Sequence, residues 1–75
     1  MKDIKKFKRK KIFDKNYDEL YVGADVSVPT PTTEDLWNFD FSGTILSFDK
    51  ENNYCIVEDG DGDCWAVEPE RLELE

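Results

Sequence analysis

The chain has 75 residues, too few for two domains, and its aromatic fraction of 13% suits one small core. The formal net charge of −8 is unevenly distributed: residues 1–11 hold seven cations and one carboxylate, and residues 12–75 hold three cations and seventeen carboxylates. Neither a run of ~18 apolar residues nor the apolar core of a secretory signal occurs, so we expect no membrane span and a cytoplasmic protein.

Residues 1–19 are expected to be a basic tail that precedes a domain over residues 20–75. The apolar residues of this segment do not keep a helical spacing, and cations lie between them. The tail is therefore predicted to be mobile or partly helical, or to pack on the domain through Phe13 and Tyr17.

A period of two begins at Leu20 and predicts a half-buried first strand. The alternating apolar residues are Val22, Ala24, Val26 and Val28. Pro29 and Pro31 end this strand, because proline cannot donate to a ladder. In the long loop from Pro29 to Asp40, Thr32 with Asp35 resembles a capping box and predicts one short helical turn.

The rest of the chain predicts four more strands and two polar hairpin turns. In the second strand Ile45 is expected on one face, with Leu46 and Phe48 on the other. A proline at a first helical position predicts one 3₁₀ turn before the last strand. The expected elements are strands at Phe41–Phe48, Tyr54–Glu58, Cys64–Glu68 and Leu72–Leu74, with the turn at Pro69–Arg71. We expect an all-β, five-stranded SH3-like barrel.

The residues of these strands resemble the Tudor group of SH3-like barrels over roughly residues 20–75. The matching segments are Phe41–Ile45, Tyr54–Gly60, Gly62-Asp63, Val67 and Leu72. Tudor modules bind methylated lysine or arginine in an aromatic cage through cation–π attraction. The resemblance implies that Trp37, with Phe39 or Phe41, fills two cage positions. Glu58 and Asp61 fall where further cage aromatics would lie, so those positions would attract an unmodified cation.

The aromatic residues allow two interpretations at this point. Trp37, Phe39 and Phe41 either cap the open end of the barrel as core or line an exposed groove for a partner. Trp65 alternates with solvent-facing neighbours beside Val67 and is expected in the core.

The acidic hairpin and the cysteines are expected to be structural. Asp59, Asp61 and Asp63, with Glu70, echo a calcium-binding loop, but Cys64 stands where such a loop needs glycine, so a soluble turn is favoured over a cation site. Cys55 and Cys64 are expected to be reduced packing thiols, and whether they share a face depends on the centre of the turn. With no histidine and no C-x-x-C spacing, no zinc site, no other metal and no cofactor are predicted.

The favoured function is a non-enzymatic interaction module whose acidic barrel binds a basic segment of a protein partner. The absence of histidine excludes a triad of the common form. The partner-binding residues are predicted to be Trp37, Phe39, Phe41, Glu58 and Asp61, and substitution of Trp37 by alanine is expected to weaken binding without unfolding the domain.

Two alternatives remain open from the sequence. The tail could grip the phosphates of nucleic acid, or touch a membrane surface or another protein. The nucleic-acid contacts would be Lys5, Lys6, Lys8, Arg9, Lys10 and Lys11. The acidic body could instead act as a decoy that mimics the charge of DNA. The partner and the oligomeric state are left open.

Overall fold

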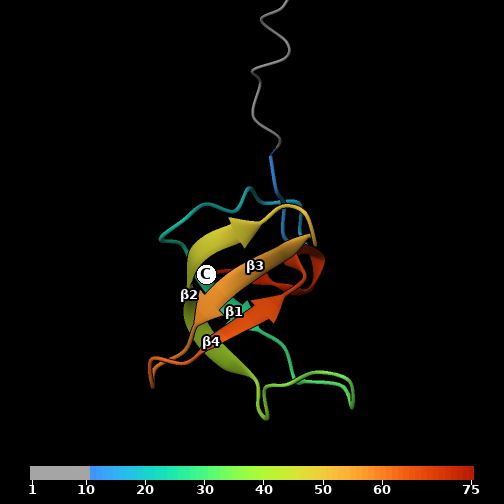
Figure 1. Ribbon diagram of the computed structural model, residues 1–75. Coiled ribbons are helices and arrows are strands. Elements are labelled where there is room, and N and C mark those ends of the chain that lie inside the picture. The colour runs from blue at the N-terminus through green and yellow to red at the C-terminus, as the bar shows by residue number, and fades with distance from the viewer. Residues whose placement is uncertain (1–10) are drawn as a thin grey trace, which may run out of the picture.

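The computed structural model describes residues 11–75, and these form an all-β protein with five antiparallel strands, as predicted. The strands are β1 (Asp25–Val28), β2 (Phe41–Asp49), β3 (Tyr54–Glu58), β4 (Cys64–Val67) and β5 (Glu73–Leu74), and one 3₁₀ turn, η2 (Pro69–Arg71), precedes β5 (Figure 1). In this part of the chain no helix is long and apolar enough to cross a membrane.

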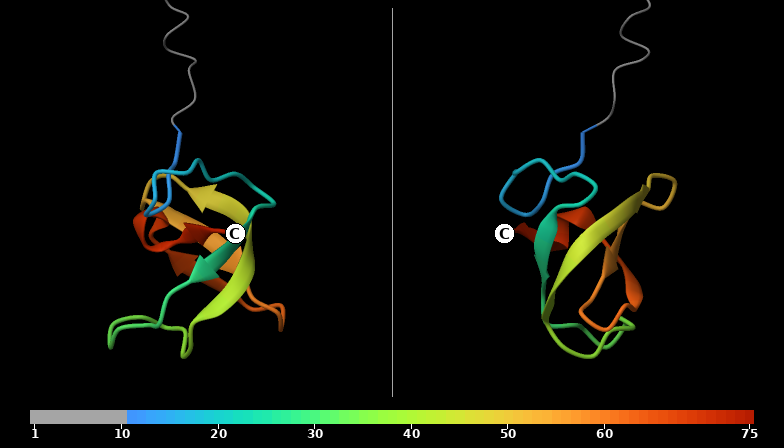
Figure 2. Two further views of the ribbon diagram at one scale, coloured as in Figure 1. Left: turned by 180° about the vertical axis from the view of Figure 1, so that it is seen from behind. Right: turned by 90° about the vertical axis from the view of Figure 1, so that its left-hand side faces the viewer.

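The five strands form one sheet in the order β4-β3-β2-β1-β5. The sheet curls strongly around the core, but β4 and β5 are its two edges and do not pair, so it is not closed into a barrel. The β1–β2 loop and the β3–β4 hairpin lie at one end of the molecule, and the turn that precedes β1 lies at the other (Figure 2).

The core lies inside the curled sheet and is built from alternate residues of every long strand. The buried apolar residues are Leu20, Ala24, Val26, Val28, Trp37, Ile45, Cys55, Val57, Val67 and Leu72. The first strand begins later than predicted, and Val22 is 59% exposed rather than buried. Gly23, with a φ of 93°, makes a turn here, so the period of two starts only at Ala24.

Because of a β-bulge in β2, Phe48 faces the opposite side of the sheet from the one predicted. The register slips between Ile45 and Ser47, so that Ile45 lies opposite Val57 and Phe48 lies opposite the buried Cys55. Because the bulge inserts one extra residue into β2, the side chains after it alternate in the opposite phase. Phe48 therefore packs against the core, on the same side as Ile45 and not on the opposite one.

The two cysteines lie on opposite faces of the β3–β4 hairpin. The turn is centred on Asp61, which places Glu58 opposite Cys64, and Cys55 opposite Val67. Cys55 is buried, and burial raises the pKa of its thiol to about 11, with the nearby charge of Glu70 adding to the rise. Cys64 is exposed, so the prediction that both cysteines are packing thiols is wrong for Cys64.

The turn of residues 12–20 packs on the last strand through a buried carboxylate, Asp14. Its Oδ1 accepts hydrogen bonds from the backbone N–H groups of Asn16 and Asp18, and its Oδ2 accepts one from Leu74 at 2.7 Å. Burial alone would raise the pKa of this carboxyl, but the three hydrogen bonds outweigh it and lower the pKa. Phe13 and Tyr17 are 43% and 85% exposed, so neither is the main anchor of this segment.

The capping interaction predicted in the long loop is present, but the loop forms a hydrogen-bonded turn there and not a helical one. The Asp35 N–H donates to the Thr32 carbonyl at 3.2 Å, and the Thr32 N–H donates to the Asp35 carboxylate at 2.7 Å. The Thr32 hydroxyl in turn accepts from the Glu34 N–H at 3.3 Å. This turn fixes the stretch of loop that leads into Trp37.

Candidate functional site

A groove with a volume of about 440 Å³ lies between the end of the β1–β2 loop and the β3–β4 hairpin. We call it the acidic-aromatic groove, because aromatic rings and aspartates make up most of its lining. The lining residues are Trp37, Asn38, Phe39, Asp40 and Phe41 from the loop and the start of β2, and Asp59, Gly60, Asp61, Asp63 and Trp65 from the hairpin and β4.

Trp37 belongs to the core and also contributes to the wall of the groove. It is only 5% exposed, and its indole N–H donates to the Pro29 carbonyl at 2.9 Å. The guanidinium of Arg71 lies 5.2 Å from the centroid of the Trp37 ring, within cation–π range. This ring therefore supports the groove, and its loss would also open the core.

A cluster of charged groups behind Trp37 fixes the loop to η2. The guanidinium of Arg71 donates to both carboxylate oxygens of Asp35 at 2.9 Å and to Glu68 at 3.3 Å. The bond from Arg71, supported by the N–H of Thr32, holds the pKa of Asp35 well below its usual range. Two hydrogen bonds from Arg71 to Asp35, 36 positions earlier in the chain, thus hold the loop in place.

The two phenylalanines differ in their exposure. Phe39 is 78% exposed, and Phe41, the first residue of β2, is half-buried and packs against the core. Phe41 also lies against Gly43, where an added Cβ would come within 3.1 Å of the Phe41 ring. Of the groove aromatics predicted from the sequence, Phe39 offers the largest free apolar surface.

The acidic hairpin uses one carboxylate for its own structure and leaves others exposed. Asp59 Oδ1 accepts from the N–H groups of Asp61 and Asp63 at 2.8 and 3.0 Å, and its Oδ2 accepts from the indole N–H of Trp65 at 2.9 Å. The Trp65 bond in particular lowers the pKa of Asp59, and burial opposes this only partly. Asp61 and Asp63 are exposed, so their charges face solvent beside the rings.

The predicted partner-binding residues come together in part. Trp37, Phe39, Phe41 and Asp61 all line the groove, whereas Glu58 does not and lies half-buried in β3. Sequence reasoning did not include Trp65, because its alternation with Val67 assigned it to the core. The signal available in the sequence was Asp59, six residues before Trp65, whose carboxylate accepts the indole N–H.

The predicted nucleic-acid residues from Lys5 to Lys10 lie outside the described residues. Lys11 is the first residue that the structure describes, and it is exposed. Within residues 11–75, no group of three or more histidine, cysteine, aspartate or glutamate side chains is arranged to hold a metal ion.

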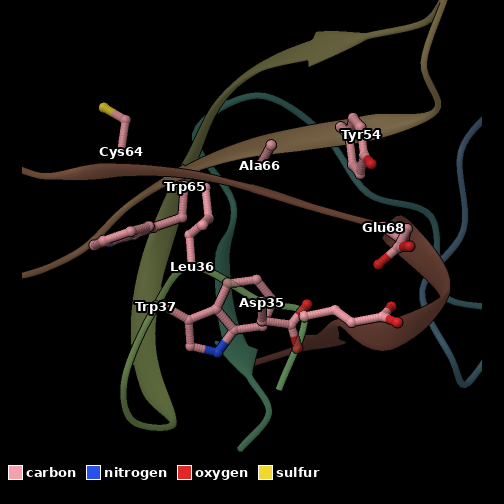
Figure 3. Close-up of a pocket in the computed structure, with 9 residues that line it drawn as sticks. Asp35, Leu36, Trp37, Tyr54, Cys64, Trp65, Ala66 and Glu68 are labelled. Carbon is pink, nitrogen blue, oxygen red and sulfur yellow. The ribbon is translucent and has the colours of Figure 1, made fainter. Parts of the chain in front are cut away.

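A second hollow, with a volume of about 400 Å³, runs along β4, which is an edge strand of the sheet (Figure 3). We call it the strand-edge hollow. It shares Trp37 and Trp65 with the acidic-aromatic groove, and Leu36, which is 82% exposed, projects into it from the loop. Cys64, Ala66 and Glu68 follow its length along β4 and just beyond it.

The combination of aromatic rings and exposed carboxylates is suited to binding a cation. Ring faces attract cations electrostatically, and this attraction strengthens when the cation is partly desolvated. The aspartates beside the rings add direct charge attraction. The comparisons with known proteins add no assignment, because no family model, no curated protein and no solved structure matches the chain.

Proposed function

We propose that the chain is a small, non-enzymatic interaction module of the cytoplasm, whose acidic-aromatic groove binds a basic segment of a protein partner. The observation that carries this proposal is the meeting of Phe39, Phe41 and Trp65 with Asp61 and Asp63 in one groove. A lysine or arginine side chain placed there would meet both ring faces and carboxylates.

The charge of the described chain supports a basic partner. Residues 11–75 contain four lysine and arginine residues against seventeen carboxylates. A field of this sign raises the rate at which a cationic segment meets the protein, and the groove then holds the segment. The affinity should therefore fall as the salt concentration rises.

We also propose that the fold is an open variant of the SH3-like, Tudor-like barrel. Five short antiparallel strands, a long β1–β2 loop and a 3₁₀ turn before β5 support this assignment. The groove lies between the β1–β2 loop and the β3–β4 hairpin, which are the segments where the resemblance implies a cage. The exposed carboxylates of Asp61 and Asp63 favour an unmodified cation over a methylated one.

Phe39→Ala tests the groove, because Phe39 is exposed and its removal leaves the core intact. The probe is a capped seven-residue peptide of alternating lysine and valine, titrated into the full chain at low salt, with tryptophan fluorescence as the signal. We expect Phe39→Ala to weaken binding about fivefold, since a cation–π contact contributes roughly 1 kcal/mol. Trp37→Ala is a poor test, because it would also cost about 3–5 kcal/mol of stability.

Tyr21→Ala is the matched control, since Tyr21 is 57% exposed and lines neither hollow. It should bind the peptide as the unchanged chain does. Equal affinities of the Phe39→Ala and Tyr21→Ala chains would remove the groove from the proposal.

The nucleic-acid alternative remains a prediction about the tail. Lys5, Lys6, Lys8, Arg9, Lys10 and Lys11 would supply its phosphate contacts, and binding to RNA or DNA that disappears when residues 1–11 are deleted would support it.

A further inference from the structure

The strand β4 has a free edge. Asp59 donates its N–H to the Asp63 carbonyl at 2.8 Å, which makes Asp59 and Asp63 a hydrogen-bonded pair at the head of the hairpin. Such pairs alternate along an antiparallel ladder. Trp65 and Val67 therefore bond to β3, and Cys64 and Ala66 turn their N–H and C=O groups away from it. Within residues 11–75 no other strand pairs with that side of β4.

The opposite edge of the sheet is protected, which makes the edge at β4 distinctive. At β5 the turn of residues 12–20 covers the strand: the Leu74 N–H donates to Asp14, and the Leu72 carbonyl accepts from the Lys15 N–H at 3.0 Å. Proteins usually cover or block exposed strand edges, because these edges are templates for pairing with another chain.

The strand-edge hollow follows the free edge of β4. Both Cys64 and Ala66 line it and are exposed, and Figure 3 shows their side chains on one side of β4 and Leu36 with Trp37 on the other. A strand laid in this space would meet open backbone groups along one side. Its alternate side chains would meet the apolar surface of Leu36 and Trp37.

The charge around the hollow selects among the possible occupants. Glu34 and Glu68 lie on its rim, and the acidic hairpin continues from the start of β4. Arg71 is already bonded to Asp35 and Glu68. A second copy of the chain, placed edge to edge, would bring the same carboxylates together, whereas a cationic strand would be attracted.

We propose that the free edge of β4 accepts an extended cationic segment of a protein partner as a sixth strand. This inference rests on the proposed function, because it specifies how the basic segment binds. Backbone hydrogen bonds to Cys64 and Ala66 hold the segment, alternate side chains lie against Leu36, and the remaining cationic side chains face the carboxylates. The shared wall at Trp65 lets one segment continue into the acidic-aromatic groove.

The test uses the full chain and three forms of the lysine–valine peptide. One form is unmodified, one carries N-methyl groups on the valine amides, and one carries them on the lysine amides. Consecutive amides of a strand point to opposite edges, so only one of the methylated peptides keeps the N–H groups that face β4. We expect one methylated peptide to bind like the parent and the other to bind about tenfold more weakly.

A protein variant tests the same contact from the other side. Ala66→Pro removes an N–H that points away from β3, which a strand edge tolerates, and it should weaken binding of the parent peptide about tenfold. Ala66→Thr keeps the N–H and should bind normally. If Ala66→Pro does not fold, as judged by circular dichroism, the methylated peptides still decide the question.

The outcomes separate the two proposals. If none of the three peptides binds at low salt, the proposed function fails and the inference falls with it. If the peptides bind, Phe39→Ala weakens them and the two methylated forms bind with equal affinity, the proposed function stands and strand addition is overturned.

Discussion

Asp14 connects two segments that are far apart in the chain. Its carboxylate accepts from Asn16 and Asp18 within its own turn and from Leu74 across the molecule. A buried carboxylate is stable only when such hydrogen bonds replace its contacts with water. The same group therefore shapes the turn before β1 and protects the edge at β5.

Replacement of Asp14 by alanine should strongly destabilise the protein. Three backbone N–H groups would lose their acceptor, so we expect the free energy of unfolding to fall by about 2 kcal/mol or more. Urea unfolding monitored by tryptophan fluorescence measures this loss. The control is Asp18→Ala, which changes an exposed carboxylate in the same turn and should stay within about 0.5 kcal/mol. Similar losses in both variants would contradict the role given to Asp14.

Single residues were predictable from the sequence only where their partners lie nearby. The Thr32–Asp35 turn was predicted because the hydrogen bonds among its own residues span three residues or fewer. Asp14 was not, because its acceptor role depends on an N–H sixty residues later. Trp37 could be core or groove from the sequence, since its burial depends on contacts, among them those with Pro29 and Arg71, that only the folded chain brings together.

Among the elements, β2 carries most of the irregular geometry of the sheet. Near its start, a Cβ on Gly43 would lie 2.5 Å from the carbonyl oxygen of Glu58 and 2.7 Å from the side chain of Val57. The bulge between Ile45 and Ser47 then bends the strand. The close approach at Gly43 lets β3 pack tightly and leaves room for the Phe41 ring.

Gly43→Ala should therefore destabilise the sheet, because a backbone oxygen cannot move away cheaply. We expect a cost of about 1–3 kcal/mol, measured as a lower midpoint of thermal unfolding. Gly60→Ala is a matched control, since an added Cβ there has no neighbour within 4 Å. A Gly43→Ala chain as stable as the Gly60→Ala chain would show that the strands separate more easily than this geometry implies.

The strands whose pattern and flanking turns are local were predicted almost to the residue. Tyr54–Glu58 and Pro69–Arg71 match their expected bounds, because polar turns and a proline delimit them. The start of β1 and the face of Phe48 were wrong, since a glycine turn and a bulge shift the alternation without a clear sequence signal. The groove was predicted in outline from its loop aromatics, but its pairing with Trp65 required the hairpin register.

At the scale of the whole molecule, ionised carboxylates stabilise the fold. Hydrogen bonds hold the pKa values of Asp14, Asp35 and Asp59 below those of ordinary aspartates. In the unfolded chain these groups titrate near pH 4. As the pH falls through this range, the unfolded state takes up protons first, so stability present above about pH 4 is lost below it.

We therefore expect the urea midpoint to change little between pH 7 and pH 5 and to fall steadily below about pH 4. The measurement is made in 0.5 M NaCl, which screens the repulsion among the remaining carboxylates. Asp14→Asn should show a smaller acid-dependent fall than the unchanged chain, because one of the linked groups is absent. A midpoint that rises below pH 4 would mean that relief of repulsion outweighs these hydrogen bonds.

The strand order also sets the sequence of events during synthesis. The hairpins that join β2, β3 and β4 pair strands that follow one another in the chain, but β1 lies between β2 and β5 in the sheet. One side of β1 thus stays unpaired until residues 73–74 have been made, for the seconds that elongation needs. The Asp14 carboxylate also accepts a hydrogen bond from Leu74, which belongs to the same strand, β5. We therefore expect the sheet to be complete only after β5 has been made, and a nascent chain that stops before β5 to expose the unpaired side of β1.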